Sequence, residues 1–174
     1  LVGSEMCIRD RITAVTFFVD HFSGYVYGHL MCNTSMKQTL EAKQAYERHA
    51  SSHGVDVIRY RADNGQFSNP EFLQAVESTD QSITFCAVGG HHQNGIAEKK
   101  IGDVTALART LLQHAKRNWP EVITVALWTF ALKYAILVMN TLSMDETGST
   151  PLSKFTNSLA VSYTQLTLPT IFSL

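Results

Sequence analysis

Residues 12–32 read ITAVTFFVDHFSGYVYGHLMC, and this stretch decides the fold. Two runs rich in β-branched and aromatic residues, 12–19 and 25–32, flank the short segment HFSG, with Asp20 at the border of the first run. Such runs separated by a turn signal are typical of paired β-strands. The stretch therefore predicts a β-hairpin.

The rest of the chain alternates segments of helix type with segments of strand type. Gly54 is expected to end the first helix, and Pro70 stands at the first position of the second. The predicted helices span about 35–52, 70–78, 96–116 and 118–142, and the predicted strands span 55–61 and 82–88. Strands that alternate with helices predict an α/β fold, in which a mixed sheet carries helices on its faces.

Size, charge and cysteine content limit the classes of protein to which the chain can belong. The chain has 174 residues, of which 45% are hydrophobic, enough for one domain with a full core. Its formal net charge of -1 provides no overall basic field, so DNA would have to bind a local basic patch. The three cysteines include no CxxC pair, which argues against a disulfide framework and a cysteine-rich zinc site. We expect Cys32 and Cys86 to pack as small core residues in a reducing, intracellular compartment.

Residues 122–139, VITVALWTFALKYAILVM, come close to the length and hydrophobicity of a membrane span. Lys133 is the single charge of this segment and lies near its centre, where a charge is costly in a bilayer. We therefore expect a core or dimer-interface helix and no membrane partner.

Two acidic residues stand where the predicted elements would converge. In the stretch YRADNGQF, residues 60–67, Asp63 follows a strand and precedes the turn signal Asn64-Gly65. Glu98 falls in the first turn of the helix after strand 82–88. Carboxylates near one rim of a sheet can hold Mg²⁺ or Mn²⁺ and support phosphoryl transfer. The alternative is that Asp63 only starts a turn and Glu98 only complements the helix dipole.

Four segments resemble the catalytic core of retrotransposon integrases. They are FFVDHFSGYVYGHL, YRADNGQFSNPEF, FCAVGGHHQNGIAEKKIGDV and TGSTPLSKF, and the resemblance covers about residues 13–157. The copia type is closest, within the wider retroviral-like integrase group. The resemblance implies a ribonuclease-H-like fold, an Asp-Asp-Glu triad that binds two Mg²⁺ (or Mn²⁺) ions, and the joining of element DNA ends to target DNA. Asp63 matches the second acidic residue and Glu98 the third.

The sequence departs from that pattern at the first acidic residue of the triad. In the family it lies on a strand before the hairpin, and here residues 1–11, LVGSEMCIRDR, occupy that region. Asp20 lies at the hairpin itself and is interpreted as a turn residue. We therefore expect a sheet truncated at its first strand, and a fragment with little or no strand-transfer activity.

Both ends of the chain look foreign to the domain between them. Residues 1–11 and the tail 158–174, with VSYTQLTLPT at 161–170, resemble translated sequencing-library adapters of the transposase-tagmentation kind. The integrase-like core is thus expected to be residues 12–157.

The loop GGHHQNG and the helix after it carry the candidate DNA contacts. Asn94 can hydrogen-bond a DNA end, and Lys99 and Lys100 can contact phosphates. The resemblance implies element and target DNA as partners, a homodimer or higher integrase oligomer, and an intracellular location in the nucleus or in a cytoplasmic virus-like particle. Two alternatives are another ribonuclease-H-like nuclease and a non-catalytic DNA-binding or self-associating module derived from a transposable element.

Overall fold

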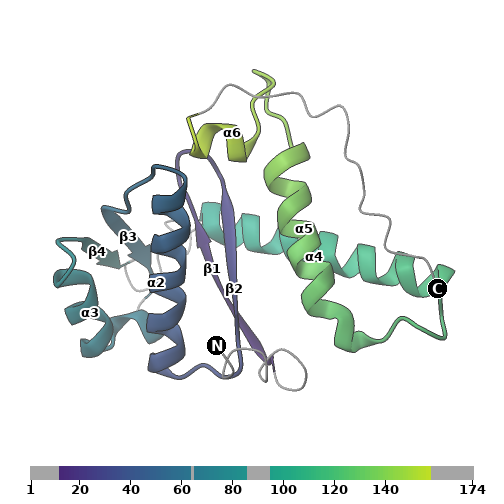
Figure 1. Cartoon of the computed structure of the whole chain (residues 1–174), viewed down its shortest axis with the longest axis horizontal. Helices are drawn as coiled ribbons and strands as arrows, with labels where there is room; N and C mark the ends of the chain where they lie inside the picture. Colours follow the sequence, from purple (N-terminus) through teal and green to yellow (C-terminus); the bar gives the residue numbers. More distant parts are fainter. Residues whose placement is uncertain (1–11, 64, 86–94, 158–174) are drawn as a thin grey trace.

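The computed structural model describes residues 12–63, 65–85 and 95–157 (Figure 1). In chain order these residues form β1 (Ala14–Val19), β2 (Val26–Met31), α2 (Met36–Ser52), β3 (Arg59–Ala62), the 3-10 turn η1 (Gln66–Ser68), α3 (Pro70–Glu77), β4 (Ser82–Phe85), α4 (Gly95–Asn118), the 3-10 turn η3 (Val125–Leu127), α5 (Trp128–Leu142) and α6 (Pro151–Phe155). The fold is α/β, as predicted, and the predicted order of strands and helices is confirmed. The two end segments interpreted as adapter-derived lie outside the described residues.

The predicted hairpin is formed by β1 and β2, which pair antiparallel with Ala14 opposite Met31. Its turn is held by Asp20, whose carboxylate accepts hydrogen bonds from the backbone N–H of Ser23 at 2.7 Å and from the Ser23 hydroxyl at 2.6 Å. Gly24 has a φ of 70°, a left-handed conformation that glycine adopts without strain. Asp20 is therefore a turn residue, as predicted.

Strand β1 is covered on both faces. Ala14 and Phe18 lie on the side of α2 and α3, in or against the buried cluster of Phe18, Met31, Ala42, Tyr46, Tyr60, Phe72 and Val76. Val15, Phe17 and Val19 lie on the side of α4 and α5, against buried Val26, Val104, Ala108, Leu132 and Ala135. Figure 1 shows α2 on one side of the hairpin and α4 with α5 on the other. Burial on both faces explains why the strand reads as an almost continuous apolar run.

Helix α5 is attached to the outer edge of β2 by a buried amide. The Asn140 side chain accepts a hydrogen bond from the Val26 N–H at 2.9 Å and donates one to the Val26 carbonyl at 2.7 Å. The two elements also approach closely, because a Cβ placed on Gly28 would lie 2.7 Å from Cδ1 of Ile136. Asn140 thus provides at Val26 the two hydrogen bonds that a neighbouring strand would otherwise make.

Strands β3 and β4 form a second, parallel sheet in which Arg59 lies opposite Ser82. Within the described residues, β1 hydrogen-bonds with β2 and β3 with β4, so the predicted mixed sheet is present as two two-stranded sheets. Antiparallel and parallel pairing both occur, but no described strand joins the two sheets.

A buried ion pair connects α2 to the second sheet. The Lys43 side chain is only 3% exposed and lies 2.7 Å from the Glu47 carboxylate. The same carboxylate oxygen accepts hydrogen bonds from the Tyr60 hydroxyl at 2.8 Å and from the Gln81 amide at 2.7 Å. This network sets the position of α2 over β3 and β4.

Helix α6 was not predicted as an element and is docked by aromatic side chains. Thr150 and Ser153 form a reciprocal capping box at its start. The Phe155 ring stacks on Tyr25 with centroids 4.3 Å apart, and the Tyr25 hydroxyl lies 2.8 Å from Nε2 of His49. His49, to which no role was assigned, therefore helps to fix α6 on α2 and β2.

The segment before α5 differs from the prediction. The Asn-Trp-Pro-Glu sequence was expected to open the last helix, but Val122 and Ile123 donate backbone hydrogen bonds to the Trp119 carbonyl and close a single turn. Helix α5 begins only at Trp128. Proline signals a break in helical hydrogen bonding, and here the break ends α4 instead of starting α5.

Residues Val125–Leu142 are, among the described residues, the one helical stretch long and apolar enough to cross a membrane by length and composition. A packed helix of a globular protein passes the same test. Here Leu132 and Ala135 are buried against the rest of the domain, Asn140 is hydrogen-bonded to β2, and Lys133 is exposed.

Cys32 corrects the expectation about cysteines. It follows β2 directly and is disulfide-bonded, whereas a small core thiol was predicted. The odd number of cysteines and their spacing do not reveal which of them approach one another in space. Cys86 lies outside the described residues.

Replacing Asn140 with alanine tests its role at the edge of β2. We expect a loss of about 2–4 kcal/mol in the free energy of unfolding, because the buried N–H and carbonyl of Val26 both lose their partner. Urea denaturation measures the change, and Thr141→Ala on the same helix serves as the control. A loss no larger than that of the control would contradict the role of Asn140.

Replacing Glu47 with glutamine tests the ion pair. Burial raises the pKa of Glu47, but hydrogen bonds from Lys43, Tyr60 and Gln81 together outweigh burial and lower the pKa below the ordinary value of 4.5. The stabilisation is therefore present above pH 4.5 and is lost as the pH falls through the lowered pKa. We expect Glu47→Gln to cost about 3 kcal/mol at neutral pH, since Lys43 stays buried without a counter-charge.

The same variant should show a weaker decline of stability as the pH falls below the ordinary carboxyl pKa of 4.5. Urea denaturation across this range measures it. Glu41→Gln, an exposed position on the same helix, should behave like the unmodified chain. An acid response that is identical in all three proteins would show that Glu47 does not govern it.

Candidate active site at the interstrand cleft

A cleft of about 610 Å³ separates the two sheets. Its walls are β1 on one side and β3 with the preceding residues 55–58 on the other. Side chains from α2, α3 and the first turns of α4 complete it: Tyr46, Phe72, Ile96, Ala97 and Ile101. We call this space the interstrand cleft.

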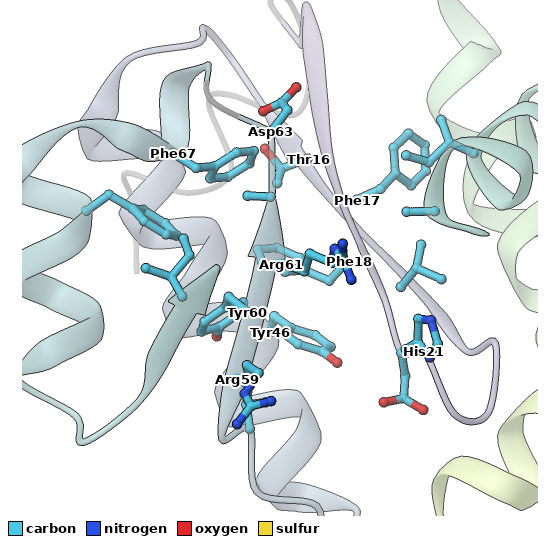
Figure 2. Close-up of a pocket in the computed structure, with 18 of the residues that line it drawn as sticks. Thr16, Phe17, Phe18, His21, Tyr46, Arg59, Tyr60, Arg61, Asp63 and Phe67 are labelled. Atoms are coloured by element: carbon cyan, nitrogen blue, oxygen red, sulfur yellow. The ribbon is translucent and has the colours of Figure 1, made fainter. Parts of the chain in front are cut away.

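Asp63 lies at one end of the interstrand cleft, where β3 ends. Figure 2 shows Asp63 and Thr16 toward one end of the cleft and Arg59 and His21 toward the other. The carboxylate is exposed and accepts a long hydrogen bond, 3.4 Å, from the backbone N–H of Gly65. Asp63 therefore starts the turn and also faces the cleft, so the two interpretations of this residue are compatible. Asn64 lies outside the described residues.

Glu98 is exposed in the first turn of α4, where a carboxylate also complements the helix dipole. Its neighbours Ile96 and Ala97 line the interstrand cleft together with Asp63, but Glu98 itself does not. The structure thus brings the start of α4 and the end of β3 to one cleft.

The described residues do not form a complete metal site. Among them, no group of three or more His, Cys, Asp or Glu side chains is arranged to hold an ion. Asp20, the acidic residue considered above for the missing first position, is engaged by Ser23 in the hairpin turn. Asp63 and Glu98 are therefore two candidate ligands of Mg²⁺ to which residues 12–63, 65–85 and 95–157 add no third, and we derive no chemical step through a bound metal.

The predicted DNA-binding residues differ in their surroundings. Lys99 is exposed on α4. Lys100 is half-buried over the hairpin turn, because a Cβ placed on Gly24 would lie 3.2 Å from its Cε and 3.4 Å from its Nζ. Asn94 lies outside the described residues. Lys99 is consequently the better placed of the two lysines for contact with a phosphate.

Sequence reasoning missed two basic residues on β3, the strand that ends just before Asp63. Arg59 and Arg61 alternate with buried residues along β3 and are both exposed on the same face of the strand. Their partners on β4, Ser82 and Thr84, are exposed as well. The alternation of charged and apolar residues in RYRA, residues 59–62, was the sequence pattern that could have identified these two arginines. This face offers positive charge and hydroxyl groups along the strands that lead to the candidate carboxylate.

The fold is shared with integrase catalytic core domains. The HTLV-2 integrase catalytic core domain in complex with magnesium superposes with a TM-score of 0.57 at 20% identity, over 82% of this chain and 92% of that one. The BIV integrase catalytic core domain gives a TM-score of 0.60 at 17% identity, over 85% of this chain and 90% of that one. The chain has the fold of an integrase catalytic core.

A simian T-cell lymphotropic virus intasome in complex with the PP2A regulatory subunit B56 gamma also matches, with a TM-score of 0.59 at 20% identity. That match covers 92% of this chain and 56% of the other. No family model and no curated protein sequence matches the chain. The predicted ribonuclease-H-like fold is confirmed, and at these identities the likeness concerns the fold alone.

Proposed function

We propose that this chain is the catalytic-core part of a DNA-integrating protein of the retroviral-like integrase group, with the copia type as the closest resemblance in sequence. One observation carries the proposal: an integrase-core fold places Asp63, at the end of β3, on the same cleft as the start of the helix that bears Glu98. A neighbour with this fold was crystallised with magnesium, and carboxylates are suited to that ion.

DNA is the proposed partner, bound through phosphate contacts. Arg59 and Arg61 on β3 are exposed and line the interstrand cleft, and Lys99 is exposed on α4, two residues after Ala97, which also lines it. Basic side chains neutralise backbone phosphates and release counterions, so a local patch suffices although the net charge is -1. These residues position DNA beside Asp63 and Glu98.

Self-association is proposed through α5. Phe130, Tyr134 and Leu137 are 46–65% exposed on this helix and recur at helical spacing. The HTLV-2 integrase core was solved in a dimeric and a trimeric form. An apolar stripe of this kind is covered when a second copy packs against it.

The chain by itself is proposed to be inactive in strand transfer, because the described residues unite no three metal ligands. The same observation favours a second candidate function, a non-catalytic DNA-binding module. The two candidates differ in one respect. In a core with a functional pair of carboxylates, replacing Asp63 removes the dependence of its activity on Mn²⁺. The DNA binding of a non-catalytic module does not depend on Asp63.

The inactivity can be tested with the purified chain, a fluorescent DNA duplex and a supercoiled plasmid in Mg²⁺ or Mn²⁺. We expect no joined and no nicked products, since two carboxylates hold a catalytic ion weakly. Asp63→Asn is the control that exposes a contaminating nuclease. Metal-dependent joining that disappears in this variant would contradict the proposed inactivity.

Replacing Lys99 with alanine tests the DNA contact. We expect weaker binding to every duplex sequence, and a slope of log K against log salt that is smaller by about 0.9, because one phosphate contact is lost. Fluorescence anisotropy across a salt series measures both quantities. Lys116→Ala, at the far end of the same helix, is the matched control, and equal effects of the two substitutions would place the DNA elsewhere.

A further inference from the structure

The turn of the β1–β2 hairpin carries the most exposed large apolar side chain among the described residues. Phe22 is 84% exposed, although the strands on both sides of the turn pack into buried clusters. A single exposed apolar residue is common on protein surfaces and indicates nothing by itself. What indicates a binding role for Phe22 is the way in which the turn holds the ring and the charge that lies beside it.

The backbone on both sides of Phe22 is fixed by hydrogen bonds. The Asp20 N–H donates to the Tyr25 carbonyl at 2.9 Å, and the Gly24 N–H donates to the Asp20 carbonyl at 2.9 Å. The Asp20 carboxylate accepts the two hydrogen bonds from Ser23 described above, and the Ser23 hydroxyl oxygen accepts one from the Tyr25 N–H at 3.1 Å. A ring presented by so constrained a turn binds a partner with little further loss of backbone freedom.

Positive charge reaches the same turn from α4. A Cβ placed on Gly24 would lie 3.4 Å from Nζ of Lys100, so this ammonium group lies against the turn. Lys99, the preceding residue, is exposed. Within residues 12–63, 65–85 and 95–157, neither lysine forms an ion pair. The carboxylate of the turn, Asp20, is already engaged by Ser23.

An exposed aromatic ring beside a cation suits an unpaired nucleotide. A base outside a duplex offers a flat face on which an aromatic side chain stacks, and a lysine meets the neighbouring phosphate. A protein interface, in contrast, has a contiguous apolar centre. The residues next to Phe22 are the polar His21 and Ser23, so the ring does not continue into an apolar surface along the turn.

The hairpin turn is separate from the candidate metal ligand at the end of β3. Figure 2 shows His21, the residue before Phe22, at the end of the interstrand cleft opposite to Asp63. Phe22 itself does not line the cleft. A nucleotide on the ring would therefore hold DNA at a second point, away from Asp63.

We propose that Phe22 stacks on an unpaired base of DNA while Lys100 contacts the phosphate next to that base. The inference rests on the proposed DNA-binding function and deepens it, because it specifies a single-stranded segment, such as an overhang, as part of the DNA that the chain binds. Neither contact depends on a bound metal or on catalysis.

Fluorescence anisotropy without added metal tests the proposal on the full chain, with a blunt duplex and with the same duplex extended by a short single-stranded overhang. We expect Phe22→Ala to bind the overhang DNA about tenfold more weakly, as for the loss of stacking on one base, and to bind the blunt duplex unchanged. Phe22→Trp should bind the overhang DNA at least as tightly as the unmodified chain. Trp119→Ala, which removes an aromatic ring that is 59% exposed before α5, is the matched control and should have no effect.

A fluorescent adenine analogue, 2-aminopurine, placed in the overhang reports the stacking directly, because its emission falls when it stacks on an aromatic ring. We expect quenching by the unmodified chain and none by Phe22→Leu, which keeps an apolar side chain without a ring. Equal affinity of Phe22→Ala and the unmodified chain for the overhang DNA, or quenching that persists in Phe22→Leu, would overturn the inference.

The blunt duplex separates this inference from the proposed function. If the chain binds the duplex with the salt dependence expected for Lys99, and Phe22→Ala has no effect on overhang binding, the proposed function stands and the stacking site is wrong. If the chain binds neither DNA, both are wrong. If Phe22→Ala weakens self-association in sedimentation and leaves DNA affinity unchanged, a second copy of the chain covers the ring, and this result also overturns the inference.

Discussion

The backbone groups at the edges of the β1–β2 hairpin need partners, and the arrangement of the domain depends on how each edge is satisfied. A buried N–H or carbonyl without a partner is costly, so every strand edge near a core must be paired, covered or hydrated. On the edge of β2, the Asn140 amide hydrogen-bonds with both backbone groups of Val26. These bonds hold α5 against the strand, and α4 packs with α5 in the same buried cluster. On its other edge, β1 lines the interstrand cleft.

The candidate active site lies at this second edge. Asp63 ends the strand that forms one wall of the cleft, and the helix that carries Glu98 begins beside it. Sheet and site are consequently linked, because Asp63 and the residues of β1 line the same cleft.

Local pattern was sufficient for most of the elements. The hairpin, α2, α3 and α4 lie where periodicity and capping signals predicted them, and Asp20 proved to be a turn residue because its hydrogen bonds are to residues close in sequence. Prediction was poorer where partners are distant in sequence. The start of α5, the docking of α6 through Phe155 and the disulfide of Cys32 all depend on contacts that no local pattern encodes.

The sequence by itself determined the order of strands and helices, the apolar character of β1 and the positions of Asp63 and Glu98 at element ends. These features follow from residue type and spacing, which act within a few residues of the chain. Only the tertiary structure decided that the strands form two separate sheets, that Asn140 closes one edge of the hairpin, and that Asp63 shares a cleft with the start of α4. Those outcomes rest on packing and backbone pairing between segments far apart in the chain, and such pairing is settled only when all layers are assembled.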